Sequence, residues 1–314
     1  MPDEISYVEH AQDVLAAAAE MIAQGERFAL VTSVAIKGGT ARELGSLALV
    51  TAAGQMVGYL SNGCIDQDIR LNALSCLEDG KRKLVHYGEG SPFPDLTLPC
   101  GGMLKVLLDP APDIGSLANA YVSLQERKPA KLSFATDPAE DPLIIEYDPK
   151  PRITLAGRGA VFRAAAKLAH SSGFEVFCLT PDEEDAAAVS DLCEASVQRL
   201  LSPRASYPLY LDHWSAFLTL FHDHSWEPNL LKSALGSNSR FVGALGSKRT
   251  HESRLGVLAE MGCTGSDLAR IRGPVGLVSS LRSADLIAVS VMAEVTACFT
   301  RSQRRVSATA EFAA

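Results

Sequence analysis

Ile153-Thr-Leu-Ala-Gly-Arg-Gly159 is a short apolar segment that runs directly into two glycines. The apolar residues predict a buried strand, and the alanine-rich residues 160–171 predict a helix that ends before Gly173. Residues 174–179 are again apolar and predict the next strand. Strand, glycine turn, helix and strand in this order form the opening βαβ unit of a doubly wound parallel sheet. The stretch therefore predicts a Rossmann-like domain in the second half of the chain.

The same glycine turn raises the question of a dinucleotide. Backbone N–H groups of a Gly-x-Gly turn can hold a pyrophosphate, so Gly157 and Gly159 are candidate cofactor-binding residues. The full fingerprint also needs a third small residue, where this chain has Phe162. It needs an acid at the end of the second strand, but Thr180-Pro181 stands there and Asp182 comes late. These departures favour a Rossmann-like architecture without NAD(P), in which the glycine turn serves packing.

Strand and helix patterns continue to alternate toward the C-terminus. We expect strands at residues 216–221 and 240–245, and helices at 228–235, 246–261, 266–271 and 283–300. The first half reads differently, with helices expected at 7–24, 65–77 and 114–125. Its expected strands are residues 28–36, 47–51, 56–60, 83–87, 103–108, 131–136 and 143–147. Pro149-Lys-Pro151 predicts a linker, which separates a mixed α+β domain (1–150) from the Rossmann-like domain (151–314).

Composition limits the classes of function. A length of 314 residues suits two domains, and a formal net charge of −8 argues against non-specific binding to nucleic acid or to an anionic membrane. No apolar run approaches the roughly 20 residues that span a bilayer, and no signal peptide is apparent at the N-terminus. Seven cysteines without disulfide-scaffold spacing indicate a reducing cytoplasm.

Two of the cysteines follow small-residue turns in the first half, Ser61-Asn-Gly-Cys64 and Leu98-Pro-Cys-Gly-Gly102. Cys64 stands at a predicted helix start, where the helix dipole stabilises a thiolate. Cys100 is followed by two glycines, so a large ligand could approach the bare backbone. Soft thiolate sulfur suits a soft metal or sulfur transfer. From residue chemistry alone, two buried thiols beside tight turns remain the simpler interpretation.

Two further motifs follow predicted strands of the second half. His222-Asp-His224 stands at the carboxyl end of a predicted strand, and we expect both imidazoles to point to the same face because strand side chains alternate. They could bind a metal, although spacing places no third ligand, or they could contact an anion or cofactor, or only cap a loop. Gly246-Ser-Lys-Arg249 is a glycine turn before a basic helix start, which suits a phosphate or another anion. The alternative is a solvated helix start with two surface cations.

Six motifs in order resemble the XdhC/CoxI family, over about residues 10 to 300. They are Ser61-Asn-Gly-Cys-Ile-Asp66, Leu98-Pro-Cys-Gly-Gly102, Gly157-x-Gly159, His222-Asp-His224, Phe241-Val-Gly-Ala-Leu-Gly-Ser-Lys-Arg-Thr-His251 and Gly273-Pro-Val-Gly-Leu277. The resemblance implies a cytoplasmic, homodimeric accessory protein for a molybdenum hydroxylase such as xanthine dehydrogenase. Such a protein would bind the molybdenum cofactor as cargo, support its sulfuration and insert it into the apo-enzyme, with a cysteine desulfurase as a further implied partner.

The resemblance also implies a set of cofactor-binding residues, with no catalytic residue and no resident metal. The set is Arg42, Gly63, Cys64, Cys100, Gly101, Gly102, Gly157, Gly159, His222, His224, Gly246, Ser247, Lys248 and Arg249. Two alternatives stay open at this point. One is an NAD(P)-dependent oxidoreductase, and the other is a scaffold that docks onto a molybdoenzyme without holding the cofactor.

Overall fold

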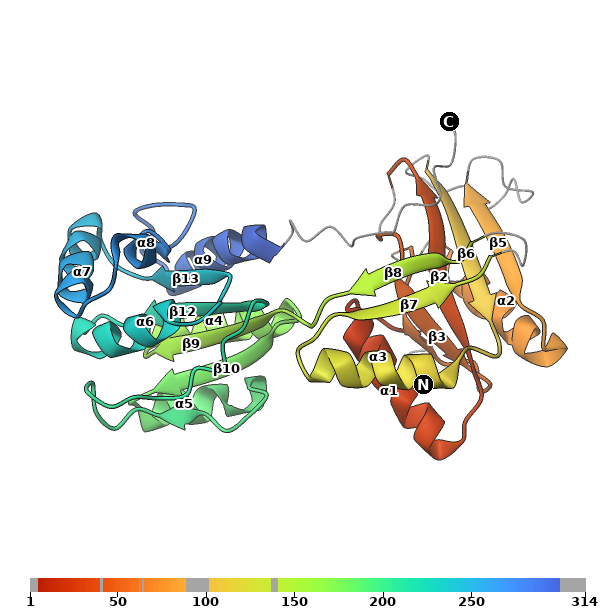
Figure 1. The fold of residues 1–314 in the computed structure, drawn as a ribbon, viewed down its shortest axis with the longest axis horizontal. Coiled ribbons are helices and arrows are strands. Elements are labelled where there is room, and N and C mark those ends of the chain that lie inside the picture. The colour runs from red at the N-terminus through yellow and green to blue at the C-terminus, as the bar shows by residue number, and fades with distance from the viewer. Residues whose placement is uncertain are drawn as a thin grey trace. The chain divides into compact units, whose positions relative to one another are not determined.

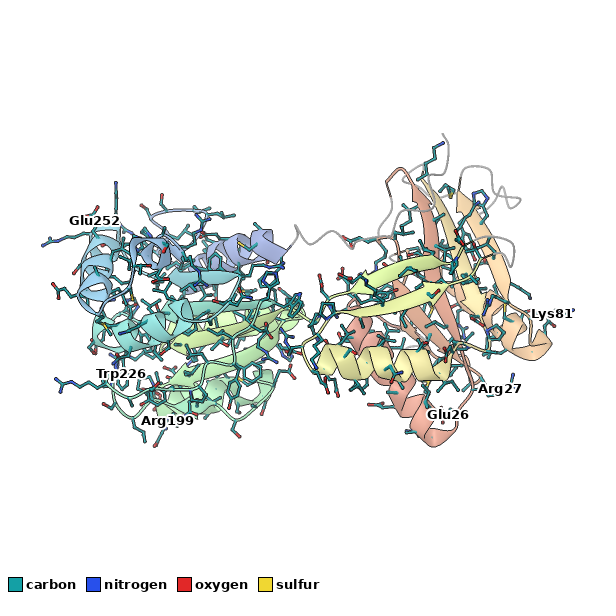
Figure 2. All side chains as sticks on the ribbon, viewed as in Figure 1. Glu26, Arg27, Lys81, Arg199, Trp226 and Glu252 are labelled. Atoms are coloured by element: carbon teal, nitrogen blue, oxygen red, sulfur yellow. The ribbon has the colours of Figure 1, made fainter. Side chains whose placement is uncertain are left out.

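The computed structural model describes residues 5–39, 42–61, 63, 65–88, 102–136 and 141–299 (Figure 1). The chain divides into two compact units, the first ending at Pro149 and the second beginning at Lys150. Each unit has its own sheets and helices and its own buried clusters of apolar side chains. Charged side chains such as Lys81 in the first unit and Glu252 in the second project outward (Figure 2).

The first unit is built on a six-stranded sheet. Its strand order is β1 (Ile5–Ser6), β4 (Met56–Gly58), β3 (Leu47–Thr51), β2 (Phe28–Lys37), β6 (Met103–Asp109) and β5 (Lys83–Gly88). Only the β1–β4 pair is parallel among these neighbours, and the other four pairs are antiparallel. Strands β7 (Ala130–Phe134) and β8 (Leu143–Tyr147) form a separate antiparallel ribbon.

Both faces of this sheet are covered, which explains why the first seven residues of β2 are all buried. Helices α1 (Ala11–Gln24) and α3 (Ile114–Gln125) and the β7–β8 ribbon pack on the face that carries Leu30. Helix α2 (Asp66–Asp79) packs on the opposite face, which carries Val31. Alternate residues of a strand point to opposite faces, so a strand buried on both sides reads as a continuous hydrophobic run.

The second unit is a parallel six-stranded sheet. Its order is β11 (Gln198–Arg199), β10 (Glu175–Thr180), β9 (Arg152–Gly157), β12 (Ser215–Leu220), β13 (Phe241–Ala244) and β14 (Ile271–Arg272). Counted along the chain of this unit, the order is 3-2-1-4-5-6, which is that of the Rossmann fold. The predicted fold class, a mixed α+β domain followed by a Rossmann-like domain, is therefore confirmed.

Helices cover both faces of the parallel sheet (Figure 1). On one face lie α4 (Ala160–Ser171), α5 (Glu183–Val189) and α9 (Ala284–Phe299). On the other lie α6 (Glu227–Leu235) and α7 (Lys248–Glu260). Short helical turns are η1 (Ser190–Leu192), η2 (His224–Trp226) and α8 (Gly265–Leu268). Among the helices of the described residues, none is long and apolar enough to span a membrane.

Several element boundaries differ from the sequence-based expectation. The helix expected from residue 7 begins at Ala11, because His10 caps it by accepting from the N–H of Gln12. The helix expected at 266–271 is wrong in its second half: α8 ends at Leu268, and Ile271 belongs to edge strand β14 beside Val242. A two-residue strand has too few residues to show alternation, so only its pairing with β13 reveals it. Helix α5 was not among the expected elements.

Candidate functional site

Three of the predicted motifs leave one edge of the parallel sheet. Strands β9, β12 and β13 are adjacent, with Gly157 opposite Leu220 and Thr219 opposite Ala244. The motifs that follow these strands therefore lie along a common edge, where α/β proteins place their ligand sites. Hydrogen bonds from Ser225, together with the nearby positive charge of Arg158, lower the pKa of Asp223.

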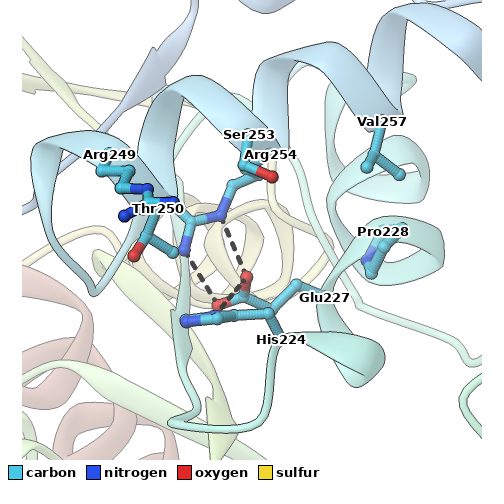
Figure 3. Close-up of a pocket in the computed structure, with 8 residues that line it drawn as sticks. All are labelled: His224, Glu227, Pro228, Arg249, Thr250, Ser253, Arg254 and Val257. Atoms are coloured by element: carbon cyan, nitrogen blue, oxygen red, sulfur yellow. Dashed lines mark hydrogen bonds and ion pairs between the residues drawn. The ribbon is translucent and has the colours of Figure 1, made fainter.

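A pocket of about 280 Å³ lies at this edge, between the η2–α6 segment and α7 (Figure 3). Its lining residues are His224, Glu227, Pro228, Arg249, Thr250, Ser253, Arg254 and Val257. The fold thus brings together His224 and Arg249, two candidates that lie 25 positions apart in sequence. His222 and Lys248 are exposed and are not among the lining residues.

The floor of the pocket is a buried carboxylate, Glu227, of which 1% is exposed. Arg254 binds it through two nitrogens, Nε to Oε2 at 3.0 Å and Nη2 to Oε1 at 3.2 Å. The hydroxyl of Thr219 donates to Oε1 at 3.3 Å, and Nδ1 of His224 lies 3.1 Å from Oε2. A buried ion pair is tolerated only when several hydrogen bonds satisfy it, as they do here. Sequence reasoning missed Glu227 and Arg254, since neither stands in a glycine turn.

Arg254 also connects the pocket floor to the end of β13. Its Nη2 donates to the carbonyl oxygen of Leu245 at 2.7 Å. Its Nη1 is buried and has no partner among the described residues. Burial and the positive charge of Arg254 lower the pKa of the neighbouring His251. The ion pair between Glu227 and Arg254 is neutral as a whole, so Arg249 remains as the positive charge on the pocket wall.

Helix α7 begins at the rim of this pocket. Ser247 is its N-cap, and the Ser247 hydroxyl accepts from the N–H of Thr250 at 3.1 Å. Gly246 has a φ of +148°, a conformation that favours glycine. The positive end of the helix dipole and Arg249 both favour an anion at this position. The four candidates from Gly246 to Arg249 therefore have distinct places: a turn, a cap, an exposed cation and a pocket wall.

The expectation that His222 and His224 share a face of a strand is wrong. Strand β12 ends at Leu220, before the motif, so the alternation of strand side chains does not apply. Asp223 instead caps η2 by accepting from the N–H of Ser225 at 3.1 Å. Both histidines are exposed, but only His224 turns toward Glu227 and lines the pocket. Within the described ranges, no group of three or more His, Cys, Asp or Glu side chains is arranged to hold a metal ion.

Gly157, the last residue of β9, and Gly159, the N-cap of α4, are glycines for different structural reasons. A Cβ at Gly157 would lie 2.8 Å from both Cβ and the carbonyl oxygen of Leu220, so only glycine fits between the strands. Gly159 has a φ of +78°, and its N–H donates to Oδ2 of Asp185 at 2.7 Å. Phe162, at the third small-residue position, is fully buried in the apolar cluster under α4. The turn is thus engaged by the chain itself.

In the first unit, the described residues show what shapes the turn before α2. Asp66 is fully buried, and its carboxylate accepts from the N–H groups of Leu60 (2.8 Å), Ser61 (3.1 Å) and Gly63 (2.7 Å). The hydroxyl of Ser61 in turn accepts from the N–H of Ile65 at 3.0 Å. Asp66 follows the motif cysteine closely in the sequence, and its role in the turn was not predicted.

The other candidates of the first unit divide into two groups. Cys64, Cys100 and Gly101 lie outside the described residues. Arg42 is buried, pairs with the carboxylate of Glu9 at 2.8 Å and lies 4.5 Å over the ring of Tyr59. A Cβ at Gly102 would lie 2.5 Å from the carbonyl oxygen of Gly39, so the backbones approach too closely for a side chain. The described contacts of Arg42 and Gly102 are therefore structural ones.

Comparison with known proteins gives the class to which this two-unit arrangement belongs. Residues 153–295 match the family described as the XdhC Rossmann domain, and residues 21–88 match the XdhC and CoxI family. A xanthine dehydrogenase structure from Bacillus halodurans has a TM-score of 0.73 with this chain, covering 95% of this chain and 98% of that one. At 18% sequence identity, that likeness shows a common fold.

Two curated relatives come from Escherichia coli (strain K12). The molybdenum cofactor insertion chaperone PaoD is 30% identical over 312 residues, covering 94% of this chain and 90% of its own length. The uncharacterized protein YqeB is 23% identical, and the match covers 90% of this chain but 46% of YqeB. The chain belongs to the XdhC/CoxI family, as its motifs predict.

Proposed function

We propose that this protein is a molybdenum-cofactor chaperone, which holds the cofactor as cargo and supports its sulfuration and its insertion into a molybdenum hydroxylase such as xanthine dehydrogenase. The observation that carries the proposal is the 30% identity, over 94% of the chain, with a protein named as a molybdenum cofactor insertion chaperone. Homodimerisation, a cytoplasmic location and a cysteine desulfurase as sulfur donor belong to the same proposal, on the strength of the family resemblance.

The pocket beside α7 is our candidate for the phosphate of the cargo. A molybdopterin ligand carries a phosphate, and Arg249 with the start of α7 supplies positive charge to this pocket. His224, oriented by Glu227, adds an imidazole that can donate to a phosphate oxygen. The hydroxyls of Thr250 and Ser253 complete a polar wall. These contacts would bind and orient the cargo without any chemical step.

The cysteines are our candidates for the metal end of the cargo. Soft sulfur of Cys64 and Cys100 suits molybdenum or its terminal sulfur. In the first unit the buried Asp66, the first residue of α2, anchors the backbone N–H groups of Leu60, Ser61 and Gly63. We therefore assign Asp66 a positioning role for the turn that carries Cys64.

Anaerobic co-purification with supplied cofactor, followed by elemental analysis for molybdenum, tests the chaperone function. We expect about one molybdenum per protomer in the wild type, and at least a severalfold loss in Cys64→Ala and Cys100→Ala, because the soft ligands are removed. Cys263→Ala, a half-buried cysteine outside both motifs, is the matched control. Wild-type protein that binds no cofactor but captures its client enzyme would instead support the docking scaffold.

Alanine variants of two adjacent cations on α7 test whether the pocket binds the phosphate of the cofactor. Arg249→Ala removes a charge from the pocket wall and should weaken cofactor binding about tenfold, the usual effect of losing one charge-assisted hydrogen bond. Lys248→Ala removes the same charge from the same helix turn but outside the pocket lining. Equal losses in the two variants would indicate long-range electrostatics and would contradict the pocket assignment.

A further inference from the structure

Asp185 lies where a dinucleotide-binding protein holds a phosphate. The residue is on α5, which follows β10, and only 3% of it is exposed. Its Oδ2 accepts from the N–H of Gly159, the N-cap of α4, at 2.7 Å. In Rossmann proteins the pyrophosphate binds at this helix start, over the glycine turn. A carboxylate of the chain thus makes the contact that a phosphate oxygen would make.

The positive charges around this position are satisfied as well. Nε of Arg163 donates to Oδ1 of Asp185, and this contact raises the pKa of Arg163. Asp185 therefore uses one oxygen for the glycine turn and the other for the cation one turn into α4. The N–H of Gly159, the N-terminus of α4 and the guanidinium of Arg163 together form an anion site. The carboxylate of Asp185 is the anion that occupies it.

The start of α5 is arranged to hold Asp185 in this position. Asp182 caps α5 by accepting from the N–H groups of Glu184 (2.9 Å) and Asp185 (3.0 Å). Asp182 is also the acid nearest the end of β10, where a dinucleotide-binding protein needs a carboxylate for the adenine ribose. Both of these helix N–H groups donate to the same oxygen of Asp182, Oδ1, so this carboxylate serves the start of α5.

We propose that Asp185 is a built-in anion that occupies the phosphate position of the glycine turn and so excludes dinucleotides from the second unit. Asp185 is on this basis a specificity-determining residue, because it leaves the Rossmann sheet intact while closing the position where abundant cellular NAD(P) would bind. A phosphorylated ligand of this unit has to bind elsewhere along the sheet edge. The inference concerns the glycine turn alone and holds independently of the cofactor-chaperone function.

Removing the carboxylate should open the site. Asp185→Ala frees the N–H of Gly159 and the guanidinium of Arg163 for an external anion. Calorimetric titration with inorganic pyrophosphate should show at least tenfold tighter binding than in the wild type, and the wild type should show no binding of NAD⁺ or NADP⁺ at millimolar concentration. Adding Arg163→Ala to Asp185→Ala should abolish the gain, because the recruited cation is lost.

Two other variants separate occupancy from charge. Glu184→Ala removes the same charge from the same helix, but Glu184 is exposed and should leave pyrophosphate binding at the wild-type level. Asp185→Asn keeps an oxygen that can accept from Gly159, so its gain should be smaller than that of Asp185→Ala. Wild-type protein that binds NAD⁺ stoichiometrically would overturn the proposal, and so would an equal gain in Glu184→Ala.

Amide hydrogen exchange provides a measurement that does not depend on the variants folding. Gly159 is exposed, so its amide would exchange rapidly if it faced water alone. Its hydrogen bond to Asp185 should slow exchange severalfold in the wild-type protein, without any added ligand. Rapid exchange at Gly159 in the wild type would show that the carboxylate does not occupy the turn.

Discussion

Helices α4 and α7 begin in similar ways at the same edge of one sheet, but they offer different sites. Each follows a parallel strand and a glycine of positive φ, Gly159 before α4 and Gly246 before α7. At α4 the free amide is met by the carboxylate of Asp185. At α7 the helix start faces a pocket whose wall includes Arg249. A glycine turn therefore shows where an anion can bind, while the packing of other elements determines whether the position is free.

The two positions also balance their charges differently. At α4 the carboxylate of Asp185 binds the N–H of the glycine turn and also pairs with Arg163, whose side chain is 39% exposed. At α7 the pair of Glu227 and Arg254 is buried under the pocket, with side chains 1% and 3% exposed. A buried pair costs more to break than one that water can reach, because the remaining charge has no solvent.

Glu227→Ala should have the largest effect on stability. It leaves the buried Arg254 without its carboxylate, which typically lowers the free energy of unfolding by about 3–5 kcal/mol. Asp185→Ala should cost clearly less, since Arg163 can turn to water. Urea denaturation of both variants measures the difference. Glu183→Ala removes an exposed pair and should change stability by less than about 1 kcal/mol. A cost for Glu227→Ala as small as that of the exposed pair would contradict the buried geometry.

Gly157→Ala tests how closely β9 and β12 approach each other at the glycine turn before α4. The added methyl would lie 2.8 Å from backbone and side-chain atoms of Leu220, so strand separation should cost about 1–3 kcal/mol. Gly256→Ala in the middle of α7 is the matched control. No atom lies within 4 Å of its new Cβ, and alanine should stabilise the helix by about 1 kcal/mol. Thermal unfolding should therefore shift in opposite directions for the two variants.

Ser247→Ala removes the N-cap of α7, the helix whose N-terminus lies at the rim of the pocket. The Ser247 hydroxyl accepts from the N–H of Thr250, and losing an N-cap costs about 1 kcal/mol. Ser247→Asp keeps an acceptor and should retain most of the stability in the same denaturation experiment. If the Ala and Asp variants are equally unstable, the hydroxyl does not act as a cap.

The smallest expected effect is the contribution of His251, on α7, to the pH dependence of stability. Burial and the nearby Arg254 hold its pKa below the usual 6.5, so the folded protein favours the neutral ring. The unfolded chain takes up a proton first as the pH falls through 6.5, and stability is lost from there down to the folded pKa. His251→Gln should flatten the slope between pH 7.5 and 5.5, with His222→Gln as the exposed control. A steeper loss of stability on acidification in His251→Gln would contradict a lowered pKa for His251 in the folded protein.

Local sequence predicted the long elements well. The expected bounds of α3, α4, β3 and β8 coincide with the observed ones, because glycine, proline or a capping residue stands close to their ends. The two-residue strands β1, β11 and β14 were missed, since pairing with a longer neighbour is their only signal. The start of α5 was missed although Asp182 and the three acids after it are a helix-start pattern.

The candidate site was predicted in part. His224 and Arg249 come from motifs that follow strands, and the parallel sheet brings them to one pocket. Their supports are Glu227, the first residue of α6, and Arg254, within α7, and no local pattern distinguishes either from an ordinary solvent-exposed polar residue. Arg42 was predicted as a cofactor contact, whereas its described contacts are an ion pair with Glu9 and a ring contact with Tyr59. A charged residue in a loop does not reveal its partner until the fold is known.

The sequence by itself determined the family, the Rossmann-like architecture of the second half and the places where helices begin after glycines. These properties follow from hydrophobic periodicity, from turn residues and from the order of motifs, all of which act over a few residues. Tertiary structure alone decided which helix start stays open. Asp185 reaches Gly159 across 26 positions, and Arg254 reaches Glu227 across 27, because the sheet brings separate helices together. The most recognisable motif of the chain is closed by a residue that no local pattern connects to it.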